Sequence, residues 1–360
     1  MSSTIGEKIK VSIFGESHGS AIGVVMDGIP AGEKIDREAL QRFLDRRAPG
    51  RRDYQTPRSE SDIPHFISGV LNGRATGAPL CALIYNEDTQ SKDYDAFSKV
   101  PRPSHADYTA ELRYGGFNDI RGGGHFSGRL TAPLCIAGGL ALQILAQRGI
   151  VIGAHIASIG SAQDTPLDPV AISAEELQAL AQKPFPVLDS NAEDAMIKTI
   201  EAVQDEQDSV GGIIECAAVG YPGGIGTPLF DGLENRLAAA IFGIPAVRGI
   251  EFGAGFAAAG MRGSTHNDAY SIIDGVIKTK TNHHGGIIGG ISSGMPIILR
   301  VSIKPTASIG LEQCSVDTVR MVETPLKIEG RHDPCIVPRA VPCVEAAVGM
   351  VLLDRLLSEQ

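Results

Sequence analysis

The sequence predicts a mixed α/β (α+β) protein made of two related strand–helix–strand units, and three observations lead to this prediction. Apolar strand-like runs alternate with amphipathic helices along the chain. Residues 19–47 resemble residues 210–243, since each segment has an apolar run, a G-x-P-x-G turn and an amphipathic helix. A second similar pair follows at residues 67–86 and 288–305. We expect an internal duplication about a pseudo-twofold axis; chance similarity of glycine-rich turns is the alternative.

The hydrophobic pattern predicts the individual elements. Val11, Ile13 and the run at residues 21–26 are typical of strands, and the glycines between them favour a tight corner. Asp36 is a suitable N-cap for a helix over residues 37–47. The 3.6-residue period predicts further helices at residues 134–147, 174–182, 191–204, 233–243 and 341–357.

The length and composition favour one domain over residues 1–360, with the pseudo-repeated units around 19–86 and 210–305. No low-complexity linker divides the chain. No apolar run reaches the length that spans a bilayer, and the first ten residues lack the hydrophobic segment of a secretory signal. We therefore expect a cytoplasmic protein without a membrane partner.

Charge and cysteine content exclude two classes of function. The net charge of -10 argues against nucleic acid as the main partner, because binding to the phosphate backbone relies on excess positive charge. The six cysteines are scattered without zinc-type spacing, so we expect buried free thiols and no metal site.

Against this acidic background, the segment RRAPGRRDYQTPR at residues 46–58 carries five arginines. A solvated charged face is the ordinary interpretation of such a cluster. Its position in a loop rich in proline and glycine favours an anion-binding site equally well.

Two histidines lie next to rigid turns, a setting typical of acid–base catalysis. His18 lies in FGESHG, and His105 lies in RPSHAD between prolines and a polar segment. Glycines 122–124, followed by Ser127 and Arg129, form a Gly-rich loop before a helix, which offers backbone N–H groups to an anion. A plain tight turn is the alternative.

Two segments of the C-terminal half add further polar groups. KPTASI supplies Lys304, Thr306 and Ser308 at the end of a strand, and GRHDPC brings Arg331 next to Asp333. A structural ion pair is the ordinary interpretation of the second segment, and a carboxylate base beside an anion-binding arginine is the alternative. Together these groups predict an enzyme that transfers protons on a phosphorylated small molecule.

At this point the sequence resembles the chorismate synthase family over nearly the whole chain. The motifs are FGESHGSAIGVVMDGIPAG, DRRAPG, RPSHADYT, RGGG, DSVGGIIE, GSTHND, TNHHGGIIGGISSG, KPTAS and GRHDPC with AVPCVEA. The resemblance implies a β-α-β sandwich with helices between two antiparallel sheets, assembled as a homotetramer. It also implies a lyase of the shikimate pathway that eliminates phosphate and a ring proton from 5-enolpyruvylshikimate-3-phosphate to give chorismate, with reduced FMN.

The resemblance also implies roles for individual residues. His18 would protonate the departing phosphate, His105 would hold a proton near flavin N1, and Asp333 would act with flavin N5 in removing the ring proton. The hydroxyls of Ser17 and Ser127 would assist. The implied flavin contacts are Arg47, Gly124, His125, Phe126, Ser127, Ala246, Gly289, Lys304, Pro305, Thr306, Ala307, Ser308 and Arg331. The implied substrate contacts are Arg47, Arg51, Arg52 and Arg129.

The chain departs from the family pattern at a few positions. HFSGRLT stands where RSSARET is common, Pro245 replaces an asparagine, and Asp53 replaces an arginine linked to NADPH use. The alternatives are therefore a catalytically inactive homologue that binds flavin or anions, and a purely structural oligomer. NADPH and an external flavin reductase are the two expected sources of reduced flavin.

Overall fold

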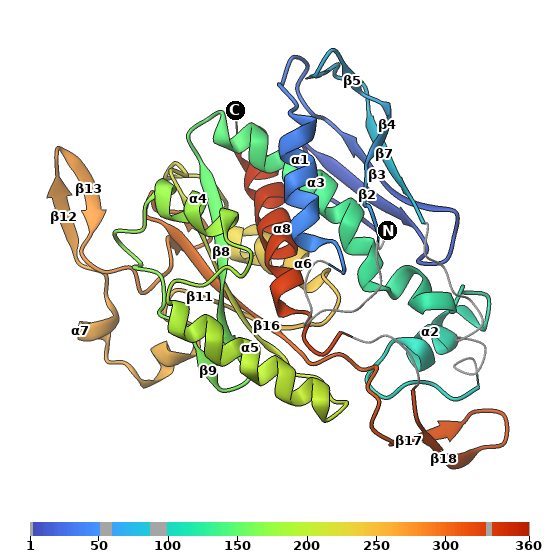
Figure 1. Ribbon diagram of the computed structural model, residues 1–360. Helices are drawn as coiled ribbons and strands as arrows, with labels where there is room; N and C mark the ends of the chain where they lie inside the picture. The colour runs from blue at the N-terminus through green and yellow to red at the C-terminus, as the bar shows by residue number, and fades with distance from the viewer. Residues whose placement is uncertain (1–2, 51–59, 87–98, 329–332, 360) are drawn as a thin grey trace.

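The protein, seen in a computed structural model that describes residues 3–50, 60–86, 99–328 and 333–359, is a sandwich of two sheets with helices between them (Figure 1). The first sheet has the order β1 (Thr4–Ile5), β2 (Lys10–Gly15), β3 (Ala21–Asp27), β7 (Leu80–Tyr85), β4 (His65–Ser68). The second has the order β11 (Val247–Phe252), β16 (Ile297–Ile303), β10 (Gly212–Val219), β8 (Val151–Ile159), β9 (Ala162–Gln163). All pairs in both sheets are antiparallel.

The layer between the sheets contains α1 (Arg37–Arg47), α3 (Thr131–Ala146), α6 (Leu233–Phe242) and α8 (Val337–Ser358). Helix α8 is buried along nearly its whole length and contacts the other three helices as well as β8 and β10. A single cluster of buried apolar side chains runs through both sheets and these helices. The predicted fold class, a β-α-β sandwich, is therefore confirmed.

The two sheets have the same topology. In the first, the hairpin β2–β3 is followed by α1, then by the edge strand β4, and β7 then inserts between β3 and β4. In the second, the antiparallel pair β8–β10, whose strands are separated in the chain by residues 160–211, is followed by α6, then by the edge strand β11, and β16 inserts between β10 and β11. The shared order is the arrangement that the predicted internal duplication requires.

The two G-x-P-x-G turns occupy equivalent places in this topology. Gly28 and Gly220 both have positive φ, 93° and 77°. A Cβ at Gly28 would lie 1.9 Å from the carbonyl oxygen of Lys8, and one at Gly220 would lie 2.3 Å from that of Gly149. Each carbonyl stands two residues before the first strand of its own antiparallel pair, β2 or β8. The same close backbone approach therefore requires glycine in both halves.

Small hairpins extend the correspondence. Hairpin β5 (Val70–Leu71) with β6 (Arg74–Ala75) corresponds to β14 (Ile287–Ile288) with β15 (Ile291–Ser292). The N–H of Gly32 donates to the carbonyl of Ala75 at 2.8 Å, and the N–H of Gly224 donates to that of Ser292 at 2.8 Å. Chance similarity of glycine-rich turns does not explain matching hydrogen bonds at matching positions.

The predicted helices are present with small shifts at their ends. Helix α1 begins after Asp36, whose side chain accepts a hydrogen bond from the N–H of Ala39 at 2.9 Å. Helix α8 begins four residues earlier than predicted, because Pro338 fits the first turn of a helix, where its missing N–H is not needed. The short helix α2 (Asp107–Tyr114) was not predicted, since it buries only Ala110 and has no clear apolar stripe.

One expectation about membrane spans is corrected. Within the described residues, the stretch Gly128–Ala146 has 19 residues and is apolar enough to cross a bilayer by length and composition. However, 83% of it is buried inside the protein. Its apolar character therefore belongs to a core helix that is buried along most of its length.

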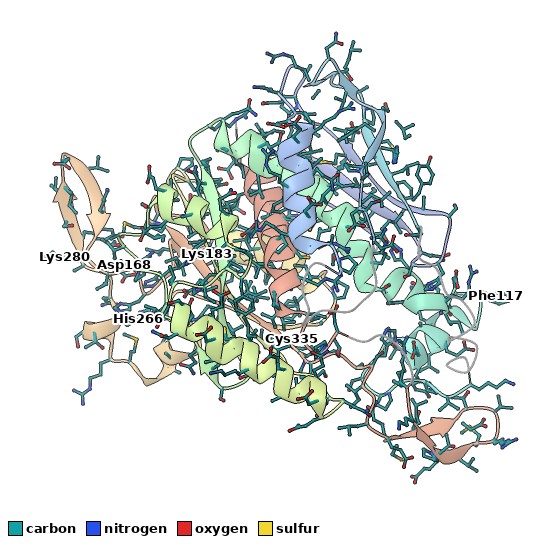
Figure 2. The ribbon with its side chains drawn as sticks, viewed as in Figure 1. Phe117, Asp168, Lys183, His266, Lys280 and Cys335 are labelled. Atoms are coloured by element: carbon teal, nitrogen blue, oxygen red, sulfur yellow. The ribbon has the colours of Figure 1, made fainter. Side chains whose placement is uncertain are left out.

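Several elements lie outside the sandwich. Helices α4 (Ala174–Gln182) and α5 (Ser190–Asp205) pack beside β8 and β9, and the hairpins β12 (Tyr270–Ile273) with β13 (Val276–Thr279) and β17 (Gln313–Asp317) with β18 (Val322–Leu326) project from it. Figure 2 places His266 and Lys280 near the base of the β12–β13 arm. There the carboxylate of Asp268 accepts hydrogen bonds from the backbone N–H groups of His283 and His284. This carboxylate ties the arm to the loop that follows it.

A buried histidine on β8 is held between two carboxylates. The Nδ1 of His155 lies 2.9 Å from a carboxylate oxygen of Asp164, and its Nε2 lies 3.0 Å from one of Glu215. Burial by itself lowers the pKa of His155, but the hydrogen bonds to Asp164 and Glu215 outweigh it and raise that pKa above 6.5. When the ring is protonated it donates to both carboxylates and crosslinks β8, β10 and the segment after β9.

The pH dependence of stability should report this crosslink. Since the folded-state pKa of His155 is raised, its contribution is complete below pH 6.5 and is lost as pH rises through the folded-state value. We expect the free energy of unfolding, measured by urea titration from about pH 6 to about pH 9, to fall in the native protein. In His155→Gln this fall should be absent, whereas His65→Gln, on an exposed strand, should retain it. If the free energy of unfolding of His155→Gln falls with pH as it does in the native protein, the assignment is contradicted.

Candidate active site

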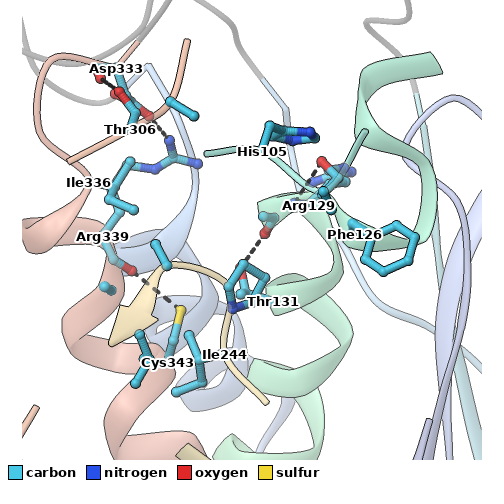
Figure 3. Close-up of a pocket in the computed structure, with 18 of the residues that line it drawn as sticks. His105, Phe126, Arg129, Thr131, Ile244, Thr306, Asp333, Ile336, Arg339 and Cys343 are labelled. Carbon is cyan, nitrogen blue, oxygen red and sulfur yellow. Dashed lines mark hydrogen bonds and ion pairs between the residues drawn. The ribbon is translucent and has the colours of Figure 1, made fainter. Parts of the chain in front are cut away.

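A cavity of about 630 Å³ lies between the ends of the central helices (Figure 3). The C-terminal ends of α1 and α6, equivalent in the two halves, contribute Arg47 and residues 242–247 to its wall. The N-terminal ends of α3 and α8 contribute Ser127, Arg129 and Asp333 with the residues after them. Both halves thus build the same site. The N-terminal ends of α3 and α8 favour anions and the C-terminal ends of α1 and α6 favour cations, so the preference of the cavity for anions rests on its arginines.

Two arginines of the cavity wall are buried and paired. Arg47 donates to a carboxylate oxygen of Asp62 at 2.7 Å and to Thr131 Oγ1 at 3.3 Å. Arg129 also donates to Asp62, and it lies 3.4 Å from Glu60. Burial raises the pKa of the Asp62 carboxyl, but the charges of Arg47 and Arg129 outweigh it and hold that pKa below its usual value. Asp62 therefore orients both arginines toward the cavity.

The pairing does not satisfy every donor of these arginines. Arg47 Nε is buried and has no hydrogen-bond partner among the described residues. A buried guanidinium donor without a partner is costly, and an anionic ligand in the cavity is one group that could accept from it.

His105 stands on the opposite wall, held by a carboxylate of its own motif. Its Nδ1 lies 2.5 Å from Asp107, and Arg102 donates to the same carboxylate through Nε and a terminal nitrogen, each at 2.8 Å. Burial would raise the pKa of Asp107, but the hydrogen bonds from Arg102 and His105 hold it far below its usual value. Nδ1 therefore carries a proton, and Nε2 is the ring nitrogen that does not contact Asp107. Arg102 also donates to Ser308 Oγ at 3.2 Å, which joins this group to KPTAS.

Asp333 faces His105 across the cavity, as Figure 3 shows. Its carboxylate forms an ion pair with Arg339, in the first turn of α8, and its carbonyl accepts from Thr306 Oγ1 at 3.0 Å. Arg339 Nε in turn donates to the carbonyl of Arg47 at 3.0 Å. Lys304 lies on the same side, and burial together with the charge of Arg248 lowers its pKa. The cavity thus places a carboxylate and an imidazole on facing walls, with cations around them.

His18 and Ser17 lie one layer behind the cavity wall. A Cβ at Gly122, which lines the cavity, would lie 2.0 Å from His18 Nδ1 and 2.7 Å from Ser17 Oγ. The N–H of Ser17 donates to the carbonyl of Gly124 at 3.1 Å. Gly122 has φ 61°, so both its conformation and this contact require glycine. The histidine of FGESHG therefore approaches the cavity past a backbone without a side chain.

The structure explains part of the departure of HFSGRL from the family pattern. His125 donates from Nδ1 to the carbonyl of Gly15 at 2.9 Å, and its Nε2 accepts from Ser3 Oγ at the same distance. Phe126 lines the cavity and packs against Tyr114, with ring centroids 6.3 Å apart. His125 thus ties the Gly-rich loop to β2 and to the start of the chain.

The remaining predicted contacts divide into three groups. Those that line the cavity are Ala246, Lys304, Thr306, Ala307 and Ser308, together with His125, Phe126 and Ser127. Gly124 and Pro305 belong to lining segments but do not line the cavity themselves. Arg51, Arg52, Asp53 and Arg331 lie outside the described residues.

Gly289 needs a correction, because the structure does not place it at the cavity. The carbonyl of the next residue, Gly290, accepts from the N–H of Leu233, the first residue of α6. The cavity lies at the other end of this ten-residue helix, about 15 Å away at the usual rise.

Sequence reasoning missed several charged residues of the site. Asp107 and Arg102 belong to the motif that pointed to His105, so their proximity was a usable signal. Glu60 and Asp62 gave no such signal, since Arg129, their partner, is more than sixty residues away. Arg339 lay two residues before the predicted start of the last helix, which was placed too late in the chain.

The fold and cavity define a class: a duplicated β-α-β sandwich with one anion-favouring, acid–base site shared by its halves. The profile of the family described as chorismate synthase matches residues 9–357, and the chain belongs to this family, whose members are carbon–oxygen lyases. Chorismate synthase of Lancefieldella parvula is 48% identical over 99% of this chain and 97% of its own length.

Two further comparisons agree with this assignment. Chorismate synthase of Pyrococcus abyssi is 48% identical over 98% of this chain and 97% of its own length. A solved structure titled "Crystal Structure of Chorismate Synthase" superposes with a TM-score of 0.77, at 25% identity, over 99% of this chain and 93% of that one.

Proposed function

We propose that this chain converts 5-enolpyruvylshikimate-3-phosphate to chorismate by anti-1,4-elimination of phosphate and a ring proton, with reduced FMN, in aromatic amino acid biosynthesis. The observation that carries the proposal is the cavity in which Asp333 and His105 face each other beside buried arginines. An elimination that releases phosphate and a proton needs a base, a proton donor and cations for the anionic substrate.

The residues present fit a flavin together with a small substrate. The cavity volume is within the range of pockets that hold cofactors. Phe126, Ile244 and Ile336 offer apolar wall to a ring system, while Thr306 and Ser308 offer hydroxyls to its polar edge. When bound, reduced FMN would supply electron density for breaking the C–O bond.

Each protein group has a proposed task. Asp333, oriented by Arg339, accepts the ring proton. His105, whose Nδ1 proton is accepted by Asp107, would carry a second proton on Nε2 at the flavin edge. Arg47 and Arg129 bind substrate anions, and His18 with Ser17 supplies the proton to the departing phosphate past Gly122. Arg51 and Arg52 are proposed substrate contacts from the sequence alone.

Anaerobic turnover of 5-enolpyruvylshikimate-3-phosphate with reduced FMN tests the proposal. We expect equal amounts of chorismate and phosphate. Flavin binding without turnover would support the inactive homologue instead, and phosphate release without chorismate would overturn the assigned reaction.

The reduced flavin needs a source, and two are proposed. NADPH could reduce FMN bound to this chain, or an external flavin reductase could supply it. Loss of the flavin absorbance when NADPH is added to the purified protein with FMN would support the first source. An unchanged spectrum, with turnover restored by an added reductase, would support the second.

We also propose a cytoplasmic homotetramer without nucleic-acid or membrane partners. The projecting β12–β13 arm supports assembly, because its side chains Tyr270, Ile272 and Ile277 are 70%, 77% and 69% exposed in the single chain. Exposed apolar side chains on a two-stranded arm are typical of a surface that another subunit covers. Light scattering after size exclusion should give four times the 37.8 kDa of one chain, and Ile272→Lys should lower this mass.

Asp107→Asn is expected to lower kcat by roughly 10- to 100-fold, the effect of losing a hydrogen bond between charged groups. The carboxylate holds the proton of His105 on Nδ1, and an amide would hold it less strongly. Asp317→Asn, which also changes an arginine-paired aspartate but on the surface, is the matched control. A normal kcat and an unchanged pH–rate profile in Asp107→Asn would contradict the positioning role.

A further inference from the structure

Two cysteines from the central helices meet beneath the cavity. Cys135 of α3 and Cys343 of α8 are both buried, and the thiol of Cys135 donates to the sulfur of Cys343 at 3.9 Å. Both are free thiols, as are the other four cysteines, all of which lie in the described part of the chain. The expectation of buried thiols therefore holds for this pair, although Cys314 is exposed.

The helices that carry the two thiols are close enough for a covalent bond between them. Three residues further along each helix, a Cβ at Gly138 would lie 2.2 Å from both the Cα and the Cβ of Ala346. Since α3 and α8 cross with almost no space between their backbones there, the preceding turns are also close. A disulfide needs Cα atoms roughly 4.4–6.8 Å apart, a separation that such tightly crossed helices offer.

The two thiols differ in access and in charge environment. Cys343 lines the cavity, so a small molecule that enters the cavity reaches its sulfur, whereas Cys135 lies behind it. The pKa of Cys343 is lowered, first by the hydrogen bond from Cys135 and then by the charge of Arg47, against burial. Figure 3 shows its sulfur beside the Arg339 carbonyl, at 3.5 Å. Burial raises the pKa of Cys135 well above its usual value.

We propose that Cys343 and Cys135 form a peroxide-reactive pair on the floor of the cavity, in which Cys343 is the attacked thiol and Cys135 resolves it. In the first step the sulfur of Cys343 attacks hydrogen peroxide, an S–O bond forms, the O–O bond breaks, and water leaves. In the second, the sulfur of Cys135 attacks that of Cys343, an S–S bond forms, the S–O bond breaks, and a second water leaves with the thiol proton. Two thiols and one peroxide thus give one disulfide and two waters.

Peptide mapping of the intact protein tests the pair directly. The fully reduced chain, without added flavin, is treated with hydrogen peroxide, and the remaining thiols are alkylated with N-ethylmaleimide in denaturant. The expected product is a peptide pair linked through Cys135 and Cys343, which disappears on treatment with dithiothreitol. Cys216, whose pKa is raised by burial and which is not on the cavity wall, should remain alkylated.

Two results would overturn the proposal. One is slower oxidation of Cys343 than of the exposed Cys314. The other is conversion of Cys343 to a sulfinic acid while Cys135 remains alkylated, which would show that no resolving step takes place. In Cys135→Ala, dimedone should trap a sulfenic acid at Cys343, and in Cys343→Ala, Cys135 should stay unmodified. If either variant fails to fold, the map of the native chain decides by itself.

Discussion

Asp333→Asn is expected to lower kcat by about 10²- to 10⁴-fold, the usual contribution of a positioned base, while FMN still binds. The amide keeps the shape of the side chain but cannot accept the ring proton. Asp333 is the carboxylate that faces His105 across the cavity, and Arg339 fixes its direction from the first turns of α8.

The measurement is anaerobic single-turnover formation of chorismate, with flavin binding followed separately by absorbance. Asp27→Asn, at the exposed end of β3, is the matched control and should be as active as the native protein. A variant that binds flavin and turns over at the native rate would show that another group removes the proton. Thermal unfolding of Asp333→Asn separates this effect from loss of the fold.

Asp62→Asn is expected to lower the free energy of unfolding by about 3–5 kcal/mol, because it removes one partner of a buried ion pair. The side chains of Asp62, Arg47 and Arg129 are at most 4% exposed. In the variant the two guanidinium groups would remain buried, and among the described residues Glu60 would be the remaining carboxylate paired with them. Their mutual repulsion, now less opposed, adds to the desolvation penalty.

Urea unfolding of the native protein, Asp62→Asn and Asp317→Asn measures this effect. Asp317 is also paired with an arginine, Arg320, but the side chain of Arg320 is 81% exposed. Loss of this ion pair should therefore lower the free energy of unfolding only a little. A loss below about 1 kcal/mol in Asp62→Asn would indicate that water screens the arginines in the cavity. Substrate binding should weaken in the same variant, since both arginines lose the group that orients them.

Much of the fold followed from local pattern. The turns at Gly28 and Gly220, the cap at Asp36 and the amphipathic stripes of α1 and α6 each leave a signal within a few residues, because backbone conformation and one-sided burial constrain the residue types locally. The duplication could be predicted for the same reason, since both halves must solve the same packing problem.

The polar site was less predictable. The histidines and the Gly-rich loop stand in recognisable motifs, yet His18 lies one layer behind the cavity wall and Gly289 lies at the far end of α6. Distances of this kind depend on how α3 and α8 cross between the sheets. Local sequence does not encode that crossing.

The sequence by itself determined the two repeated units, the family and the residue types available for acid–base chemistry, because these depend on short-range pattern. Only the tertiary structure decided that Asp62 pairs with Arg47 and Arg129, that Arg339 holds Asp333, and that Cys135 meets Cys343. The pairs Asp62–Arg129 and Cys135–Cys343 join segments distant in the chain, whereas Arg339 and Asp333 are only six residues apart and meet because α8 begins between them. Their geometry follows from the packing of four helix ends around one cavity, and that packing exists only in the folded molecule.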